Sequence, residues 1–144
     1  MKKKLMYLAM SLCLAICSSC SNEDNNKTSL EGKWEYELIG TLLEGNEMLG
    51  DYEHTPNCSK DYTELLPNGV VKNFSYEMNG FVCQEMIETG IWNKVENNLK
   101  VTIQGEISNA EIMSLTETTL KTKTTFYDEE QDENFIFIIQ FKRK

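Results

Sequence analysis

Hydrophobic and polar residues alternate along most of the chain beyond residue 30, in short runs that turn residues separate. The clearest run is LKVTI at 99–103, where an apolar residue occupies every second position. Such alternation is typical of a half-buried β-strand, and no window repeats apolar residues at helical spacing over three turns. The pattern therefore predicts an all-β domain.

Eight strands are predicted from this alternation. They cover residues 33–43, 60–66, 70–76, 86–95, 99–103, 111–115, 120–127 and 135–141. Pro67-Asn68-Gly69 is the strongest turn signal, because Asn-Gly tolerates the positive φ that a tight hairpin needs. We expect a loop from Glu44 to Cys58 and a second loop at 104–109.

The short connections between these strands favour an antiparallel up-and-down meander, since parallel strands need long crossover segments. Open edge strands invite aggregation, and closing the sheet removes them. Eight strands close around an interior wide enough for side chains or for one small ligand. The sequence thus predicts an eight-stranded antiparallel barrel over residues 30–144.

The N-terminal residues follow a different pattern. Three lysines at 2–4 precede an apolar run at 5–16, which has the length of a signal-peptide core and is too short to cross a bilayer as a helix. Two serines precede Cys20, and a polar segment without aromatic residues follows it. This arrangement resembles the lipobox of bacterial lipoproteins. It implies a signal peptide at 1–19, an acylated Cys20 and a flexible tether at 20–29.

The lipobox resemblance also implies a location. Each methylene of an acyl chain that enters a bilayer contributes about 0.8 kcal/mol, so a palmitate-type modification of Cys20 would hold the domain at a membrane. Glu23 and Asp24 look like the acidic export tag of lipoproteins in one Gram-negative phylum. We expect a lipid anchor in the cell outer membrane, with the domain on the external or the periplasmic face. A cleaved signal peptide that releases a soluble protein and an uncleaved anchor are the alternatives.

Composition restricts the partners of the chain. Its formal charge is −9, and removal of the three signal-peptide lysines makes the mature chain −12. Such an acidic surface repels phosphate, so nucleic-acid binding and docking on anionic headgroups are disfavoured.

Three cysteines remain after the signal peptide, and Cys20 is assigned to the lipid. In an oxidising compartment Cys58 and Cys83 are then predicted to form a disulfide, with two buried free thiols as the alternative. A zinc site that adds His54, the only histidine, is disfavoured because the spacing fits no compact motif. No metal site and no cofactor are expected.

Gly32-Lys33-Trp34 resembles the G-x-W motif that opens lipocalins. In that family the tryptophan closes one end of the barrel and packs near a basic residue from the end of the last strand. Arg143, the only arginine, is the candidate here, since a guanidinium over an indole gains cation–π energy. Lys142 is the alternative.

Further segments extend the resemblance over about residues 30–142. They are CSKDYT at 58–63, PNG at 67–69, Cys83, TGIW at 89–92, NNL at 97–99 and LTETTL at 115–120. Together they are similar to the lipocalin-like domain of small Gram-negative lipoproteins. The resemblance implies a lipocalin-like, calycin-type barrel.

A barrel of this kind leads us to expect a small, largely apolar ligand in its interior. The candidate interior residues are mostly aromatic or aliphatic and face one way along their strands: Tyr36, Leu38, Tyr62, Phe74, Trp92, Val101, Ile103, Met113, Phe126, Phe137 and Ile139. The alternative is a structural or protein-interaction module whose barrel is filled by its own side chains.

The last predicted strand, Phe135 to Phe141, is apolar on both faces. One face must point out of the barrel, so either a lid from the same chain or a protein partner is expected to cover it. The acidic run at 128–133 lacks the alternating ligands and central glycine of a calcium loop, and a solvated hairpin tip is the preferred interpretation.

Catalysis has little support in the sequence. No phosphate-binding loop, nucleophile elbow or Cys–His pair is visible. Tyr62, Glu64 and Glu88 are the sort of trio that any acidic chain offers by chance. We therefore expect a binding module rather than an enzyme.

Overall fold

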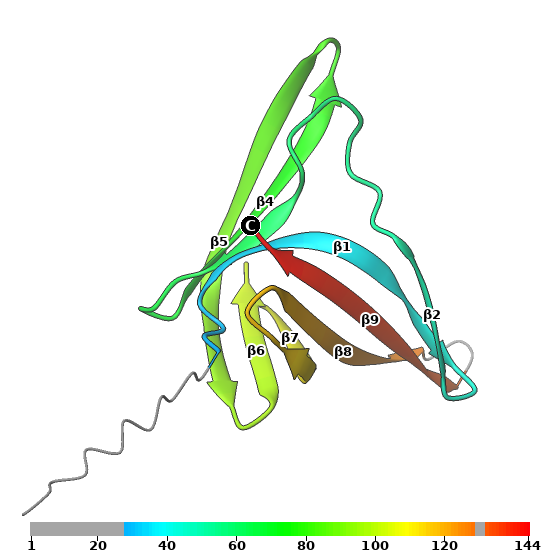
Figure 1. Cartoon of the computed structure of the whole chain (residues 1–144). Helices are drawn as coiled ribbons and strands as arrows, with labels where there is room; N and C mark the ends of the chain where they lie inside the picture. Colours follow the sequence, from blue (N-terminus) through cyan, green and yellow to red (C-terminus); the bar gives the residue numbers. More distant parts are fainter. Residues whose placement is uncertain (1–27, 129–131) are drawn as a thin grey trace, which may run out of the picture.

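A computed structural model describes residues 28–128 and 132–144 (Figure 1). The predicted signal peptide, Cys20, most of the tether and three residues of the acidic run lie outside these residues. Within the described part, every regular element is a β-strand, and no helix long and apolar enough to cross a membrane is found.

Nine strands form one antiparallel sheet. They are β1 (Gly32–Leu43), β2 (Asn46–Asp51), β3 (Tyr62–Leu65), β4 (Val70–Asn79), β5 (Val82–Val95), β6 (Asn98–Ile103), β7 (Glu106–Leu115), β8 (Thr119–Asp128) and β9 (Glu133–Arg143). All but β2 close into a barrel of eight strands, because β1 pairs with β9 along one edge and with β3 along the other. The predicted fold class is confirmed.

The ninth strand, β2, was not predicted. β1 is long enough for two neighbours on one edge, so that residues 32–35 pair with β3 and residues 38–43 pair with β2. The β1–β2 hairpin turns at Glu44 and Gly45, with φ of 49° and 81°. Positive φ at both central residues defines a type I′ turn, which Asn-Gly or Asp-Gly usually signals. Glu-Gly is a weaker signal for this turn, so the sequence predicted a loop where β2 forms part of the segment between Glu44 and Cys58.

A second turn of the same type corrects the loop predicted at 104–109. Gln104 and Gly105 have φ of 53° and 88°, and Ile103 pairs directly with Glu106. β7 therefore begins at Glu106, five residues before its predicted start. The tight turn replaces the predicted loop, and six residues of β6 pair with six residues of β7.

The outward side of β9 is covered by the chain itself. Lys121 Nζ on β8 lies 2.7 Å from Glu47 Oε2 on β2, so this ion pair spans β9, which lies between β8 and β1 in the sheet. Ile138 of β9 has no exposed surface. At Gly40 an added Cβ would come 1.8 Å from the Met48 carbonyl oxygen, so only glycine allows β2 this close to β1. Of the two interpretations of the last strand, these contacts favour the lid.

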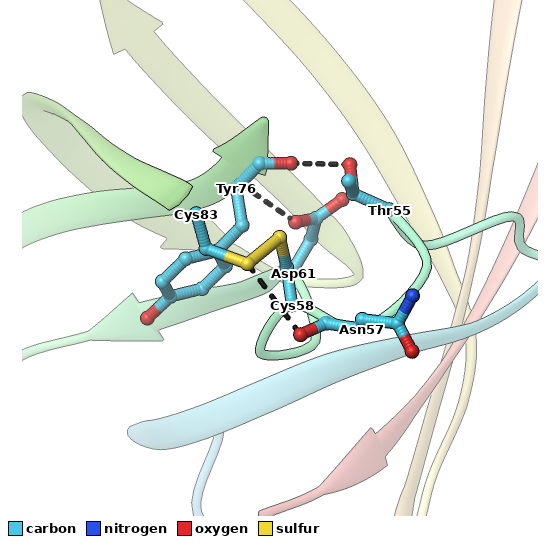
Figure 2. Close-up of a disulfide and its surroundings, with 6 residues drawn as sticks. All are labelled: Thr55, Asn57, Cys58, Asp61, Tyr76 and Cys83. Carbon is cyan, nitrogen blue, oxygen red and sulfur yellow. Dashed lines mark hydrogen bonds between the residues drawn. A yellow bond between two sulfur atoms is a disulfide. The ribbon is translucent and has the colours of Figure 1, made fainter. Parts of the chain in front are cut away.

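A disulfide joins Cys58, in the β2–β3 connection, to Cys83 on β5 (Figure 2). This confirms the predicted pairing. The outer half of the β4–β5 hairpin projects beyond the rest of the barrel (Figure 1). Beside the disulfide, the Thr55 hydroxyl donates to the Tyr76 carbonyl, and the Tyr76 amide donates to Asp61 Oδ1 at 3.0 Å. The connection thus takes the place beside β4 that the short β3 leaves empty.

We expect the double variant Cys58→Ala, Cys83→Ala to unfold with a free energy about 3 kcal/mol lower than wild type, because the bridge restricts the unfolded chain. Urea denaturation measures the difference. A reductant should lower the wild-type value by a similar amount and leave the double variant unchanged. Equal stability of the two proteins would contradict a stabilising bridge.

Candidate functional site

One end of the barrel is closed around Trp34. This side chain is 1% exposed, and its Nε1 donates a hydrogen bond to the Leu30 carbonyl at 2.7 Å. The Arg143 guanidinium lies 4.1 Å from the centre of the indole ring. The structure thus places Arg143 where the lipocalin resemblance implies a basic residue, whereas Lys142 is exposed.

Arg143 also binds three backbone carbonyls. Its Nε donates to Glu117 at 2.7 Å, Nη1 to Glu31 at 2.9 Å and Nη2 to Ser29 at 2.5 Å. One side chain therefore joins the segment before β1 to the β7–β8 turn. A Cβ on Gly32 would lie 2.6 Å from Nη1, and the φ of Gly32 is 129°. Both facts explain why glycine opens the G-x-W motif.

A cavity of about 180 Å³ lies inside the barrel, next to Trp34. No charged residue of the described chain lines it. Its lining is mostly apolar and comes from all the barrel strands except β5: Trp34, Tyr36, Thr63, Leu65, Val71, Asn73, Leu99, Val101, Ile103, Ser108, Ala110, Leu120, Thr122, Thr124, Ile139 and Phe141. The barrel is therefore hollow.

Three polar side chains form a triangle on one wall of the cavity. The Tyr36 hydroxyl donates to Asn73 Oδ1 at 3.1 Å and lies 3.1 Å from Thr63 Oγ1. The Thr63 hydroxyl also donates to Asn73 Oδ1, at 3.0 Å. Each side chain comes from a different strand, β1, β3 and β4, which are consecutive neighbours in the sheet.

Tyr36 is surrounded by aromatic rings. The Tyr52 ring stacks on it at 4.8 Å between centroids, and the Phe141 ring lies at 4.9 Å. Burial raises the pKa of the Tyr36 hydroxyl above its ordinary value, so it stays protonated as a donor. Burial, with the negative charge of Asp61 beside it, also raises the pKa of Tyr52 to about 12.

His54 supports this aromatic cluster and is not placed to bind a metal. The Asp61 amide donates to its Nδ1 at 3.0 Å, so Nδ1 is an acceptor and Nε2 donates to the Tyr36 carbonyl at 2.9 Å. Both ring nitrogens are occupied and the two cysteines are bonded to each other, which overturns the zinc alternative. No cluster of potential metal ligands was found in the described part of the chain.

Several predicted interior residues do line the cavity, namely Tyr36, Val101, Ile103 and Ile139. Leu38 does not, because the pairing of β1 with β9 shifts by one residue between Tyr36 and Leu38. This β-bulge reverses the alternation, so that Ile39 rather than Leu38 lies opposite Ile139.

A second bulge explains Met113. The pairing of β7 with β8 shifts between Ile112 and Ser114. As a result Ile112 is buried in the core, whereas Met113 is 39% exposed. Neither bulge leaves a signal in the alternation, so the sequence pattern assigned both faces wrongly.

Tyr62 and Phe74 also lie outside the cavity. They face each other across β3 and β4 on the outer surface, with stacked rings 4.3 Å apart, while their neighbours Thr63 and Asn73 line the interior. Lys144 Nζ lies 4.2 Å from the Tyr62 ring centre and covers it. The alternation on β3 and β4 is as predicted, but the polar residues Thr63 and Asn73 face the interior and the aromatic residues face outward.

Trp92, Phe126 and Phe137 occupy the margins of the site. Trp92 packs half-buried against the core, and its Nε1 donates to the Leu66 carbonyl at 3.0 Å. Phe126 and Phe137 meet edge to face at 5.8 Å and are 52% and 43% exposed. All three side chains are partly exposed to solvent, and none of them lines the cavity.

A cleft of about 570 Å³ lies at the β6–β7 turn. Val101, Ile103 and Ser108 line both the cleft and the cavity, so the two spaces are adjacent. The cleft is more polar than the cavity, since Glu88 and Glu106 lie along it. β6 pairs only with residues 90–95 of β5, and the gap beyond its end provides this opening.

Solved structures share this fold. A lipocalin-like protein from Bacteroides uniformis superposes with a TM-score of 0.57 at 8% identity, over 80% of this chain and 98% of that one. An uncharacterised protein from Bacteroides eggerthii gives 0.53 at 10% identity, over 81% and 100%. Bovine odorant-binding protein gives 0.45 at 14% identity, over 78% and 72%.

Comparison with protein-family models and with curated protein sequences finds no match. The first two superpositions show that the chain has the fold of a lipocalin-like barrel. At such low identity the likeness concerns the fold alone, and the arrangement of side chains must carry any statement about function.

We expect Arg143→Met to lower the free energy of unfolding by about 2 kcal/mol, because the indole face and three carbonyls lose their partner together. Urea denaturation measures the loss. Lys142→Met is the matched control, and this exposed neighbour should change stability by less than about 0.5 kcal/mol. Equal effects of the two substitutions would contradict the closing role of Arg143.

Proposed function

We propose that the protein is a lipid-anchored, lipocalin-like binding protein of the bacterial cell envelope, that it holds a small, largely apolar ligand, and that it is no enzyme. One observation carries the binding role: the uncharged cavity of about 180 Å³ inside the closed barrel. For comparison, an apolar cavity of about 150 Å³ in another protein is large enough to bind benzene. A filled barrel would have favoured a purely structural role.

The cleft supports the same function. A ligand has to reach the interior, and the cleft is the candidate entry because Val101, Ile103 and Ser108 line both spaces. The opposite end is blocked by Trp34 and Arg143. The barrel thus has one closed end and one open end, so a ligand can enter the binding site from one side and stay enclosed by the rest of the barrel.

The proposed anchor is compatible with this orientation. Ser29, at the start of the described chain, is bound by Arg143 at the closed end. A lipid on Cys20 would therefore hold the closed end nearest the membrane and leave the cleft accessible. The order of lysines, apolar run, serines and cysteine at the N-terminus supports the anchor itself.

A second candidate function, a protein-interaction module, is favoured by a different feature. At the tip of the projecting β4–β5 hairpin, Phe81 is fully exposed and Val82 is 70% exposed. Exposed apolar residues grouped in this way often mark an interface. Ligand binding that depends on the cavity distinguishes the first candidate from the second.

We expect ethylbenzene to bind the wild-type protein, with a change in Trp34 emission, and Ala110→Phe to weaken binding about tenfold or more by filling the cavity. Isothermal titration calorimetry measures the affinity. Asn109→Phe adds the same ring to the neighbouring exposed position and should bind like wild type. Failure of wild type to bind any apolar compound of this size would refute the binding role.

We expect Cys20→Ala to abolish incorporation of labelled palmitate and to move the protein from the membrane fraction to the soluble fraction. The physical reason is the loss of the acyl methylenes that enter the bilayer. Cys13→Ala is the matched control, since Cys13 lies in the apolar run of the predicted signal peptide and should not affect labelling. Continued membrane attachment of Cys20→Ala would rule out this anchor.

A further inference from the structure

We propose that the ligand is a neutral molecule of about one ring in size that carries a hydrogen-bond-accepting oxygen, such as a ketone or aldehyde carbonyl, and that Asn73 donates the bond. This inference rests on the proposed function, because it concerns the same cavity. It goes beyond that function by naming the chemistry that the wall of the cavity recognises.

The orientation of the Asn73 amide carries the argument. Its Oδ1 accepts two hydrogen bonds, from the hydroxyls of Tyr36 and Thr63. An amide whose oxygen is held in this way presents its Nδ2 group as a pair of donors. No hydrogen bond joins Nδ2 to any described residue, and no buried side-chain nitrogen or oxygen of the described chain lacks a partner. The Nδ2 group is therefore accessible, in a residue that lines the cavity.

Thr122 supplies a second polar group, on the opposite wall. The residue is 5% exposed and lines the cavity, yet its hydroxyl has no partner among the described residues. By the same reasoning its oxygen faces the cavity space. A hydroxyl can either donate or accept, so Thr122 tolerates several ligand orientations whereas Asn73 requires an acceptor.

The charges around the site favour a neutral ligand. None of the described residues that line the cavity can pair with an ion, and an unpaired charge is costly to bury. Glu88 and Glu106 lie along the cleft and repel an entering carboxylate. A fatty acid or an aromatic acid is therefore a poor ligand, and an uncharged carbonyl compound fits both features.

The experiment compares three probes of similar size, ethylbenzene, acetophenone and benzoate, by calorimetry with wild type and Asn73→Leu. Leucine keeps the approximate volume but removes the donor. We expect the substitution to weaken acetophenone about fivefold, the usual value of one neutral hydrogen bond, and to leave ethylbenzene within about twofold. Benzoate should bind more weakly than acetophenone to wild type.

Two further variants keep the test decisive. Asn73→Leu also removes the acceptor of Tyr36 and Thr63, so Thr63→Val is made in parallel, because it removes one hydroxyl of the triangle but keeps the Asn73 amide. It should change the affinities for acetophenone and ethylbenzene by the same factor. Asn93→Leu, the same change at an exposed position of β5, should leave every affinity unchanged.

The outcomes separate this inference from the function on which it rests. Binding of ethylbenzene together with equal effects of Asn73→Leu on both neutral probes would overturn the hydrogen bond but keep the binding role. Benzoate binding tighter than acetophenone would overturn the preference for a neutral ligand. Absence of binding by all three probes would overturn both the inference and the proposed function.

Discussion

The pairing of β1 with β9 is the interaction on which the remaining structure depends. It joins the first and last strands, so it turns an open sheet into a barrel with an interior. The bulge at this seam sets which side chains face that interior, because it reverses the alternation of β1 after Tyr36. The seam ends at Arg143, whose contacts with Trp34 and three carbonyls close one end.

The other edge of β1 carries the polar wall of the cavity. Tyr36 belongs to β1, Thr63 belongs to β3, which pairs with that edge, and Asn73 belongs to β4, the next strand in the sheet. Their hydrogen bonds satisfy three groups that would be costly to bury singly, while one amide group of Asn73 remains available. An interior of this kind combines apolar contact, which gives affinity, with one directed donor, which gives selectivity.

Stability and access are divided between different regions of the molecule. The core around Trp34, Val71 and Leu120 is fully buried at the closed end. The short β6–β7 hairpin leaves the opposite region open, and the disulfide fixes the connection beside the projecting β4–β5 hairpin. Val101 and Ile103 join the two regions, because they line the cleft and also pack against the core.

The sequence by itself determined the all-β class, the eight barrel strands, the disulfide pair and the clear one-sided strand at 99–103, since alternation and cysteine count depend only on local order. It did not reveal β2 or the early start of β7, because Glu-Gly and Gln-Gly turns carry a weaker signal than Asn-Gly. Only the tertiary structure decided which face of each strand points inward. Bulges at β1 and β7 shift the phase of alternation, and on β3 and β4 polar residues satisfy one another inside while Tyr62 and Phe74 stack outside. Which face of a strand points inward depends on the side chains that it meets on neighbouring strands. Those side chains are distant in the sequence, so the local pattern does not reveal them.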